Sequence, residues 1–438
     1  MKRINEECAK PRLPERVIQF GEGGFLRGFA DWMLQKMNDA GLFSGSVVVV
    51  QPIEHGMCAK LTEQDCVYTH VMRGLEAGRP TVRSEVVTVI SRCVEPYQDF
   101  DAYLALAEQP ELRFIISNTT ESGIIYRPGD TLSDRPPVSY PAKLTSLLHR
   151  RYEKGLDGFI LLPCELIDKN GEKLKETVLQ YASDWKLDDG FISWLNEKNY
   201  FCNTLVDRIV TGRPTENLGL TYIDDMANTS ELFHLWVIEA PEAVRGELPL
   251  REAGLNVVFT DDLERYRTRK VRILNGAHTS LVPYAMLRGF TTVGDCIADK
   301  DMRSYLEQCV YEEIIPTLDL PEEELKEYAD DVFERFANPY IRHQLSSIAL
   351  NSVSKFKVRV LPSILEYKKR RGCYPQTLLG GFAALLDFYK TEMANDAEDV
   401  MEFMKTRTLD EILANVDFWG EDLTCLKEEV VKYANPSK

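Results

Sequence analysis

Short apolar runs alternate with amphipathic stretches along the first half of the chain. Residues 17–20 form one such run, and residues 47–50 are four consecutive valines, a pattern typical of a strand that is buried on both faces. Between them, residues 25–36 place Phe, Trp and Met at near-helical spacing. Two later runs, within 112–124 and 158–167, continue the alternation. Strands that alternate with helices predict a doubly wound parallel sheet.

After about residue 260 the pattern becomes helical, and short turns interrupt it. Asp261 and Asp262 are typical of an N-cap, here before a helix that carries Lys270. Helical periodicity then recurs at 304–318, 322–338, 342–357 and 383–395. We therefore predict an α/β N-terminal domain of the Rossmann type over residues 1–262, followed by an all-α C-terminal domain over residues 263–438.

A glycine-rich turn connects the first predicted strand to the first predicted helix. Such a turn lets backbone N–H groups approach a pyrophosphate, and a guanidinium beside it can also hold phosphate. The usual spacing is G-x-G-x-x-G, but Leu26 stands where the third glycine is expected, so an ordinary strand-to-helix turn is an equal alternative. The candidate cofactor contacts in this segment are Gly21, Gly23, Gly24, Phe25 and Arg27.

Polar residues follow the later strands, where ligands of open α/β sheets bind. The run within 112–124 ends in a polar turn, in which Thr120 and Glu121 are candidate cofactor contacts, although a plain surface turn is nearly as good an interpretation. After the four valines come Gln51 and Glu54, and no Lys or Arg appears before Lys60. A pocket for a 2′-phosphate is therefore not evident, which favours NAD over NADP.

Lys270, Asn275 and His278 lie within two turns of a predicted helix. At about 100° per residue they project near 0°, 140° and 80°, so they share one broad face. An amine can exchange a hydroxyl proton, while an amide and an imidazole can hold an oxygen whose charge changes. This is the equipment of a dehydrogenase that needs no metal. Taken alone, the same trio is also typical of a solvated helix face with a core histidine.

Composition narrows the possible partners. The 438 residues carry a formal net charge of −17, which argues against nucleic acid and anionic membrane surfaces as partners. Against that background, residues 265–272 concentrate five cations, which either bind an anion or pair with carboxylates. The ten cysteines show no metal-ligand spacing and are expected to be reduced thiols of a cytoplasmic protein. No signal peptide and no membrane span are expected, and no metal site.

Several blocks of sequence, taken together and in order, carry a resemblance to a known family. They are "GEGGFLRGF", "SNTTESGI", "NTLVDRIVTG", "ELFHLWVIE", "KVRILNGAH" and "RFANPYIRHQLSSIALNSVSKFKVR". The chain resembles the mannitol dehydrogenase family, the polyol-specific long-chain dehydrogenases, along nearly its whole length. The resemblance implies a Rossmann-type domain, a helical domain, a nicotinamide cofactor and no metal. It also implies a lysine as the acid/base group, carried onto Lys270, with Asn275 and His278 holding the reacting oxygen.

Departures from the mannitol-type pattern point to a charged substrate. Glu165 and Leu166 stand in a segment where those relatives have an oxygen-holding asparagine, and Ser347 replaces an arginine. Arg267 stands where a glutamate is common. The candidate carboxylate-binding residues are Arg267, Lys355, Lys357 and Arg359. We therefore expect a small sugar acid as substrate, reduced by NADH as a keto acid.

Other functions remain open on the sequence alone. The substrate could be the stereoisomeric keto acid, a neutral ketohexose or hexitol, or a hexitol phosphate. A catalytically inactive NAD-binding regulator and a metal-dependent dehydrogenase are alternatives from other classes, which the intact trio and the lack of ligand spacing disfavour. The sequence does not indicate the oligomeric state or the physiological direction of the reaction.

Overall fold

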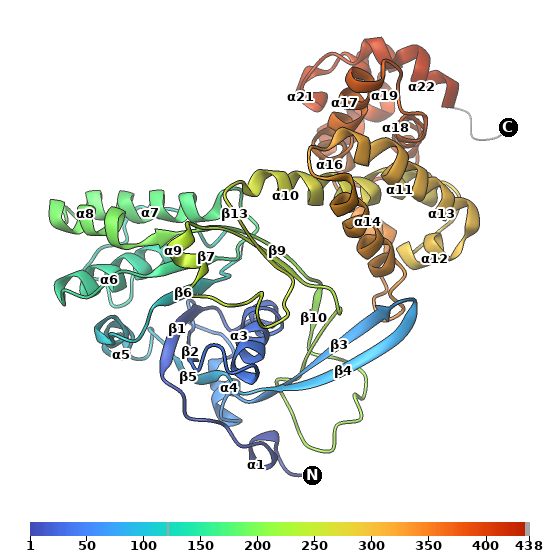
Figure 1. Ribbon diagram of the computed structural model, residues 1–438. Coiled ribbons are helices and arrows are strands. Elements are labelled where there is room, and N and C mark those ends of the chain that lie inside the picture. The colour runs from blue at the N-terminus through green and yellow to red at the C-terminus, as the bar shows by residue number, and fades with distance from the viewer. Residues whose placement is uncertain (121, 434–438) are drawn as a thin grey trace. The chain divides into compact units, whose positions relative to one another are not determined.

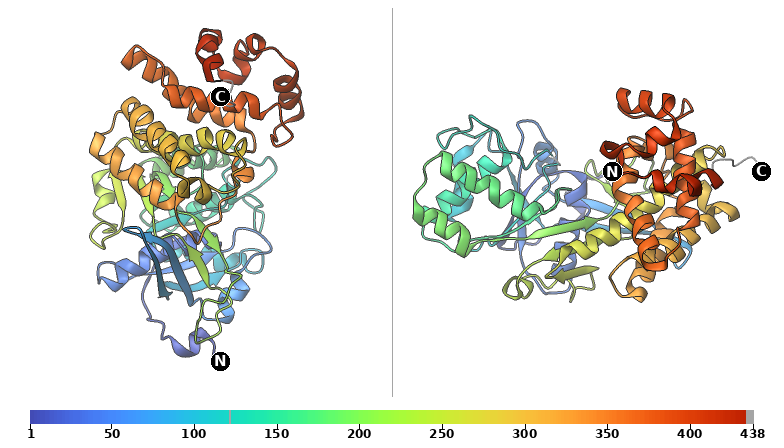
Figure 2. Two further views of the ribbon diagram at one scale, coloured as in Figure 1. Left: turned by 90° about the vertical axis from the view of Figure 1, so that its right-hand side faces the viewer. Right: turned by 90° about the horizontal axis from the view of Figure 1, so that it is seen from above.

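The computed structural model describes residues 1–120 and 122–433. The chain divides into two compact units, one of Met1–Arg73 with Val82–Leu263 and one of Gly74–Thr81 with Glu264–Lys438. The boundary at residue 262 stays a prediction. The grouping of residues 74–81 with the second unit was not predicted. Figure 1 shows the elements of both units, and Figure 2 shows them from two further directions.

A six-stranded parallel sheet forms the centre of the first unit. Its strand order is β5-β2-β1-β6-β7-β8, which is the 3-2-1-4-5-6 order of a dinucleotide-binding Rossmann fold. After β1, the chain adds β2 and β5 on one side of that strand and then β6, β7 and β8 on the other side. The switch point between β1 and β6 is where such folds bind ligands. The strands are β1 (Glu15–Phe20), β2 (Ser46–Val50), β5 (Ile90–Val94), β6 (Phe114–Ser117), β7 (Ile160–Pro163) and β8 (Tyr200–Phe201).

Helices cover both faces of this sheet, and the valines of β2 show why. Val47 and Val49 pack in one core with Trp32 and Met33, whereas Val48 and Val50 pack in a second core on the other face. The helices that contribute are α3 (Ala30–Asp39) and α4 (Cys58–Glu63) on the first face, and α5 (Phe100–Leu104), α6 (Tyr140–Glu153), α7 (Asn170–Asp184) and α8 (Asp189–Lys198) on the second. The predicted doubly wound fold is confirmed.

Two smaller sheets in the chain were not predicted. One has the order β10-β11-β3-β4 and the other β13-β12-β9. Most side chains of β4 are exposed or half-buried, so its sequence shows no apolar run. The strands are β3 (Tyr68–Glu76), β4 (Arg79–Val87), β9 (Asn203–Asp207), β10 (Val210–Gly212), β11 (Asn228–Ser230), β12 (Leu235–Glu239) and β13 (Val257–Thr260). β3 and β4 meet at a tight turn, where the Gly78 N–H donates to Glu334 Oε1 at 2.9 Å.

Up to residue 433, the second unit is helical apart from the tip of this hairpin and an isolated bridge between Thr292 and Gln344. Its α-helices are α10 (Leu263–Lys270), α11 (Gly276–Met286), α12 (Val293–Ala298), α13 (Lys300–Glu307), α14 (Glu322–Phe336), α15 (Leu345–Ile348), α16 (Ser352–Arg359), α17 (Leu361–Arg371), α18 (Gln376–Phe388), α19 (Glu398–Thr406), α20 (Leu409–Leu413), α21 (Val416–Trp419) and α22 (Lys427–Tyr433). The predicted all-α domain is confirmed.

The structure corrects two details of the predicted helices. The helix expected over 342–357 is divided into α15 and α16, because Asn351 adopts a left-handed conformation with φ 53°. The helix expected to run from Asp262 through His278 contains a π turn at Val271–Asn275.

Among the described residues, no helix is both long and apolar enough to cross a lipid bilayer.

Candidate active site

The glycine turn lies at the switch point of the sheet, and Gly21 is its most constrained residue. The Gly21 N–H donates to Val50 O at 3.1 Å, and its φ of +114° is a conformation that residues with a Cβ rarely adopt. A Cβ added here would lie 2.9 Å from Asn118 O, at the end of β6. The ends of β1 and β6 therefore approach each other closely only because residue 21 is glycine.

The next two glycines leave backbone accessible at the start of the short helix α2 (Gly24–Arg27). Gly23 is extended and exposed, and a Cβ built on it meets no atom within 4 Å. Gly24 packs against the Asn228 side chain, with 3.1 Å between its added Cβ and Oδ1. Phe25 stacks on Phe29, with ring centroids 5.0 Å apart. One side of the turn is thus packed and the other open, which fits a bound pyrophosphate.

Arg27 has a different position from the one expected. Its side chain is 3% exposed, its Nε donates to Glu22 O at 3.1 Å, and its Nη1 donates to Met226 O at 2.5 Å. The guanidinium also lies over the ring of Tyr68. These contacts hold the turn from inside the protein, so we correct the expected phosphate contact of Arg27 to a structural role.

The loop that follows β6 is held by a buried carboxylate. Glu165 is 2% exposed and accepts hydrogen bonds from Ser117 Oγ at 3.1 Å and from the Thr119 N–H at 2.9 Å. Burial raises the pKa of this carboxyl group, and the Thr119 bonds oppose that shift. Sequence reasoning recorded Glu165 only as a departure from a pattern and missed this role. Thr120 is exposed with φ 72°, and Glu121 lies outside the described residues.

The loop after β2 is held by Gln51. Its side chain is 2% exposed, donates to Ile53 O and Glu54 O, and accepts from the Cys58 N–H. The hydrogen bonds of the Gln51 side chain are therefore made to the backbone of its own loop. Glu54, in the same loop, is exposed.

The second unit carries Lys270, Asn275 and His278 on and around the π turn. Lys270 is the last residue of α10, Asn275 is the last residue of the π turn, and His278 lies in the first turn of α11. A π turn bonds residue i to i+5 and advances each residue by roughly 80°, against about 100° in an α-helix. On that geometry the three side chains project within about 60° of one another, closer than a regular helix allows.

His278 is buried beside two other aromatic rings. Its ring stacks on Phe336 with centroids 4.2 Å apart and meets His343 edge-on at 5.0 Å. The ring is 7% exposed, and its Nε2 has no hydrogen-bond partner among the described residues. Burial lowers the pKa of His278 well below its ordinary value, and positive charge on His343, Arg335 and Arg359 adds to that shift. The side chain is therefore a neutral imidazole with a buried nitrogen available for a ligand.

The predicted substrate cations have different environments. Arg267 pairs with Glu264 at 3.3 Å, Lys355 Nζ donates to Ile348 O at 2.9 Å, and Lys357 Nζ donates to Asp417 O at 3.1 Å. Arg359 ends α16, is half-buried, and influences His278 electrostatically. Within residues 265–272, Arg269 is buried and pairs with Glu324 at 2.7 Å. The structure thus brings Arg359 near His278, whereas Lys357 is hydrogen-bonded to α21.

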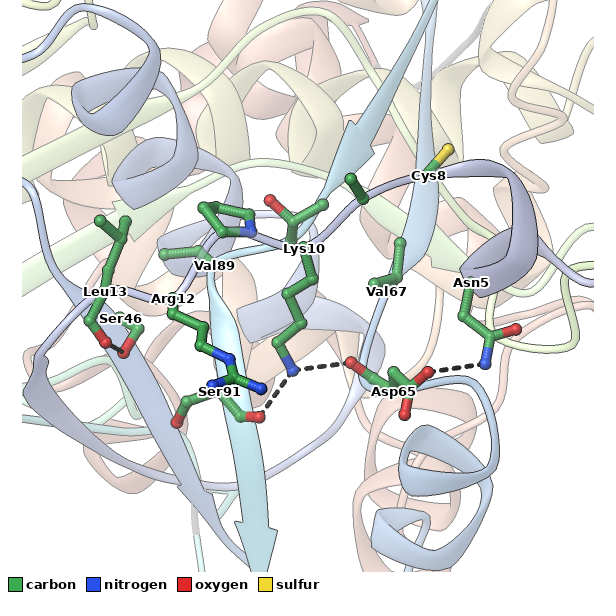
Figure 3. A pocket seen from close by; sticks show the side chains of 13 residues that line it. Asn5, Cys8, Lys10, Arg12, Leu13, Ser46, Asp65, Val67, Val89 and Ser91 are labelled. Carbon is green, nitrogen blue, oxygen red and sulfur yellow. Dashed lines mark hydrogen bonds between the residues drawn. The ribbon is translucent and has the colours of Figure 1, made fainter.

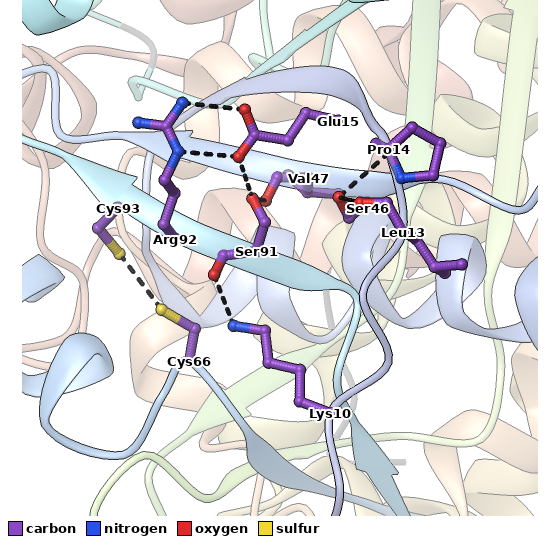
Figure 4. A network of polar contacts seen from close by, with 10 residues as sticks. All are labelled: Lys10, Leu13, Pro14, Glu15, Ser46, Val47, Cys66, Ser91, Arg92 and Cys93. Carbon is purple, nitrogen blue, oxygen red and sulfur yellow. Dashed lines mark hydrogen bonds and ion pairs between the residues drawn. The ribbon is translucent and has the colours of Figure 1, made fainter.

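A separate cavity of about 440 Å³ lies in the first unit, beside the N-terminal segment. Lys10 crosses it and donates to Asp65 O at 2.7 Å and to Ser91 O at 2.6 Å (Figure 3). None of the candidate residues that the structure describes lines this cavity. Nearby, Glu15 joins Ser91 to Arg92, and the Cys66 and Cys93 sulfur atoms are 3.8 Å apart (Figure 4). All ten cysteines are free thiols in this structure.

Among residues 1–120 and 122–433, no group of three or more His, Cys, Asp or Glu side chains has the geometry to hold a metal ion.

Comparison with known families agrees with this architecture. The mannitol dehydrogenase Rossmann domain matches residues 15–252, and the mannitol dehydrogenase C-terminal domain matches residues 262–435. The chain belongs to the mannitol dehydrogenase family. It is therefore an oxidoreductase that acts on CH–OH groups with a nicotinamide cofactor, and the predicted family is confirmed.

Altronate oxidoreductases are similar to this chain over almost its whole length. An altronate oxidoreductase of Shigella flexneri is 44% identical over 465 aligned residues, which cover 99% of this chain and 96% of that protein. An altronate oxidoreductase of Bacillus subtilis (strain 168) is 44% identical, with 97% of this chain and 93% of that protein covered.

Solved structures share the fold at lower identity. A D-sorbitol dehydrogenase in substrate-free form superposes with a TM-score of 0.82 at 22% identity, covering 96% of this chain and 92% of that one. The ternary complex of Pseudomonas fluorescens mannitol 2-dehydrogenase with NAD and D-mannitol gives a TM-score of 0.69 at 22% identity, with coverage of 96% and 91%.

Replacing Gly21 by Ala should lower the free energy of unfolding by about 1–3 kcal/mol, because the left-handed φ and the contact with Asn118 O both become strained. Denaturant titration measures this loss. Gly23→Ala is the matched control: it should unfold like the wild type and yet bind NADH more weakly, because its Cβ enters the open side of the turn. Equal unfolding free energies for Gly21→Ala and Gly23→Ala would contradict the account.

His278 should make stability fall on acidification. The unfolded chain takes up a proton at this side chain below about pH 6.5, whereas the folded chain does not, so the free energy of unfolding decreases as pH falls through that range. In His278→Asn this decrease should be smaller. Denaturant titrations at about pH 7.5 and about pH 5.5 compare the two proteins. An unchanged pH dependence in the variant would show that His278 can be protonated in the folded state.

Proposed function

We propose that this enzyme is an altronate oxidoreductase, which interconverts D-altronate and D-tagaturonate with NAD. The observation that carries this proposal is the 44% identity to altronate oxidoreductases from two bacteria over 97–99% of the chain. The substrate is a six-carbon sugar acid, and the reaction oxidises a secondary alcohol to a ketone or reduces the ketone to the alcohol.

The first unit is proposed to bind the cofactor. The packed and open sides of the glycine turn suit a pyrophosphate, and the loop after β2 carries Gln51 and Glu54 with no Lys or Arg before Lys60. Such a loop has no cation for a 2′-phosphate, which supports NAD over NADP. When bound in its reduced form, this cofactor supplies the hydride for the ketone carbon.

The second unit is proposed to supply the proton and hold the oxygen. In the reducing direction the Lys270 ammonium group donates a proton to the alkoxide oxygen that forms from the ketone. Asn275 and the buried Nε2 of His278 stabilise that oxygen while its charge develops, and a neutral imidazole can do so by donating Nε2–H. In the oxidising direction Lys270 in its amine form accepts the hydroxyl proton, so no metal ion is required by this proposal.

Replacing Lys270 by Met should reduce kcat by at least about 100-fold, because general acid–base catalysis contributes on this scale. The dissociation constant for NADH, measured by fluorescence titration, should stay within about twofold, since Lys270 does not belong to the glycine turn. Lys390→Met is the matched control, because Lys390 is an exposed lysine of the same unit that pairs with Asp387. Weakened NADH binding with normal turnover at saturating cofactor would refute the assigned role.

The substrate should be identified by NADH oxidation with tagaturonate, fructuronate and fructose in parallel, each with and without a chelator. The proposal predicts rapid turnover of tagaturonate that the chelator does not change. Preference for fructuronate would replace altronate by mannonate as the product, and turnover of fructose alone would refute a sugar acid substrate. Absence of turnover with all three compounds would favour an NAD-binding regulator.

A further inference from the structure

Arg359 differs from the other predicted substrate cations in its partners. Arg267, Lys355 and Lys357 each have a carboxylate or a backbone carbonyl within hydrogen-bond or ion-pair distance. The Arg359 guanidinium has no such partner in the part of the chain that the structure describes. It is also half-buried, and this burial lowers the pKa of the group. A partly desolvated cation without a counter-charge is costly, and a bound anion would offset that cost.

The backbone brings Arg359 close to the reacting groups. α16 packs against α11, and a Cβ added at Gly276 of α11 would lie 3.0 Å from Arg359 O. Gly276 directly follows Asn275 and is two residues from His278, so the end of α16 lies beside the first turn of α11. Arg359 is near enough to His278 and to Lys355 that its charge lowers the pKa of both.

The groups around Arg359 and His278 have distinct chemistry. Lys270, Asn275 and the free nitrogen of His278 suit a carbonyl or hydroxyl oxygen, and Phe336 covers one face of the His278 ring. A guanidinium suits a carboxylate, because its planar fork donates two parallel hydrogen bonds to the two oxygens. A sugar acid presents both functional groups on one carbon chain.

We infer that Arg359 binds the carboxylate of the substrate and is the residue that selects a keto sugar acid over a neutral ketohexose. The inference rests on the proposed function and deepens it, since it assigns the recognition of the acid to one side chain. Arg267 and Lys357, with their own partners, contribute little to this selection.

The test compares tagaturonate with tagatose, its neutral counterpart, in Arg359→Met. For tagaturonate, kcat/KM should fall by about 30- to 100-fold, chiefly through KM, because a charge-assisted bidentate contact is lost. For tagatose, kcat/KM should change by less than about threefold, since no carboxylate is present. Arg359→Lys should fall between these values, because it keeps the charge and loses the fork. Arg371→Met, which removes an exposed arginine at the end of α17, should leave the ratio of the two substrates unchanged.

Two results would overturn the inference: an equal fall in kcat/KM for both substrates in Arg359→Met, or no fall for either substrate. Binding of altronate and of altritol, its neutral counterpart, to the NAD complex gives a readout that needs no turnover. Arg359→Met should weaken altronate binding alone, and equal effects on both ligands would again overturn the inference. If the wild type reduces fructuronate instead of tagaturonate, the proposed function fails. The fructuronate and fructose pair then tests Arg359 in the same way.

Discussion

The close crossing of α16 over α11 at Gly276 is the constraint on which the arrangement of the second unit depends. Any side chain at residue 276 would meet Arg359 O at 3.0 Å, so the two helices approach this closely only at a glycine. The crossing lies directly after the π turn, which itself contacts α14 and α16. As a result, Lys270, Asn275 and His278 from one segment share a neighbourhood with Arg359 from another.

Burial then sets the chemistry of these groups. The His278 imidazole is neutral because it is enclosed by Phe336 and His343 and because nearby arginines oppose a second positive charge. A neutral ring with an unpartnered nitrogen suits an oxygen that gains negative charge, whereas the charged Arg359 suits an oxygen pair that is already anionic. In the proposed function, His278 therefore contacts the reacting oxygen of the substrate and Arg359 contacts its carboxylate.

Much of the fold could be predicted from the sequence, because its signals are local. The four valines of β2 pack on both faces of the sheet, and the glycine turn after β1 requires the positive φ of Gly21. Features that depend on distant residues could not be predicted. Strand β4 has too few buried side chains to show a pattern. The Arg27 side chain points inward because it donates to the carbonyl of Met226, a residue far along the chain.

The candidate site shows the same division. The spacing of Lys270, Asn275 and His278 identified the trio, but a regular helix was assumed where the structure has a π turn. Four cations seemed equivalent in the sequence, and only their partners in the folded chain separate Arg359 from Lys357. Glu165 shapes the loop after β6 through Ser117 and Thr119, a contact between the ends of two strands that sequence spacing does not reveal.

The most direct test of the account is the identity of the product formed from tagaturonate with NADH that carries deuterium at the transferable position. Nuclear magnetic resonance of the product should show D-altronate with one deuterium on the carbon that was the ketone. The epimeric acid, or altronate without deuterium at that carbon, would contradict the proposed reaction.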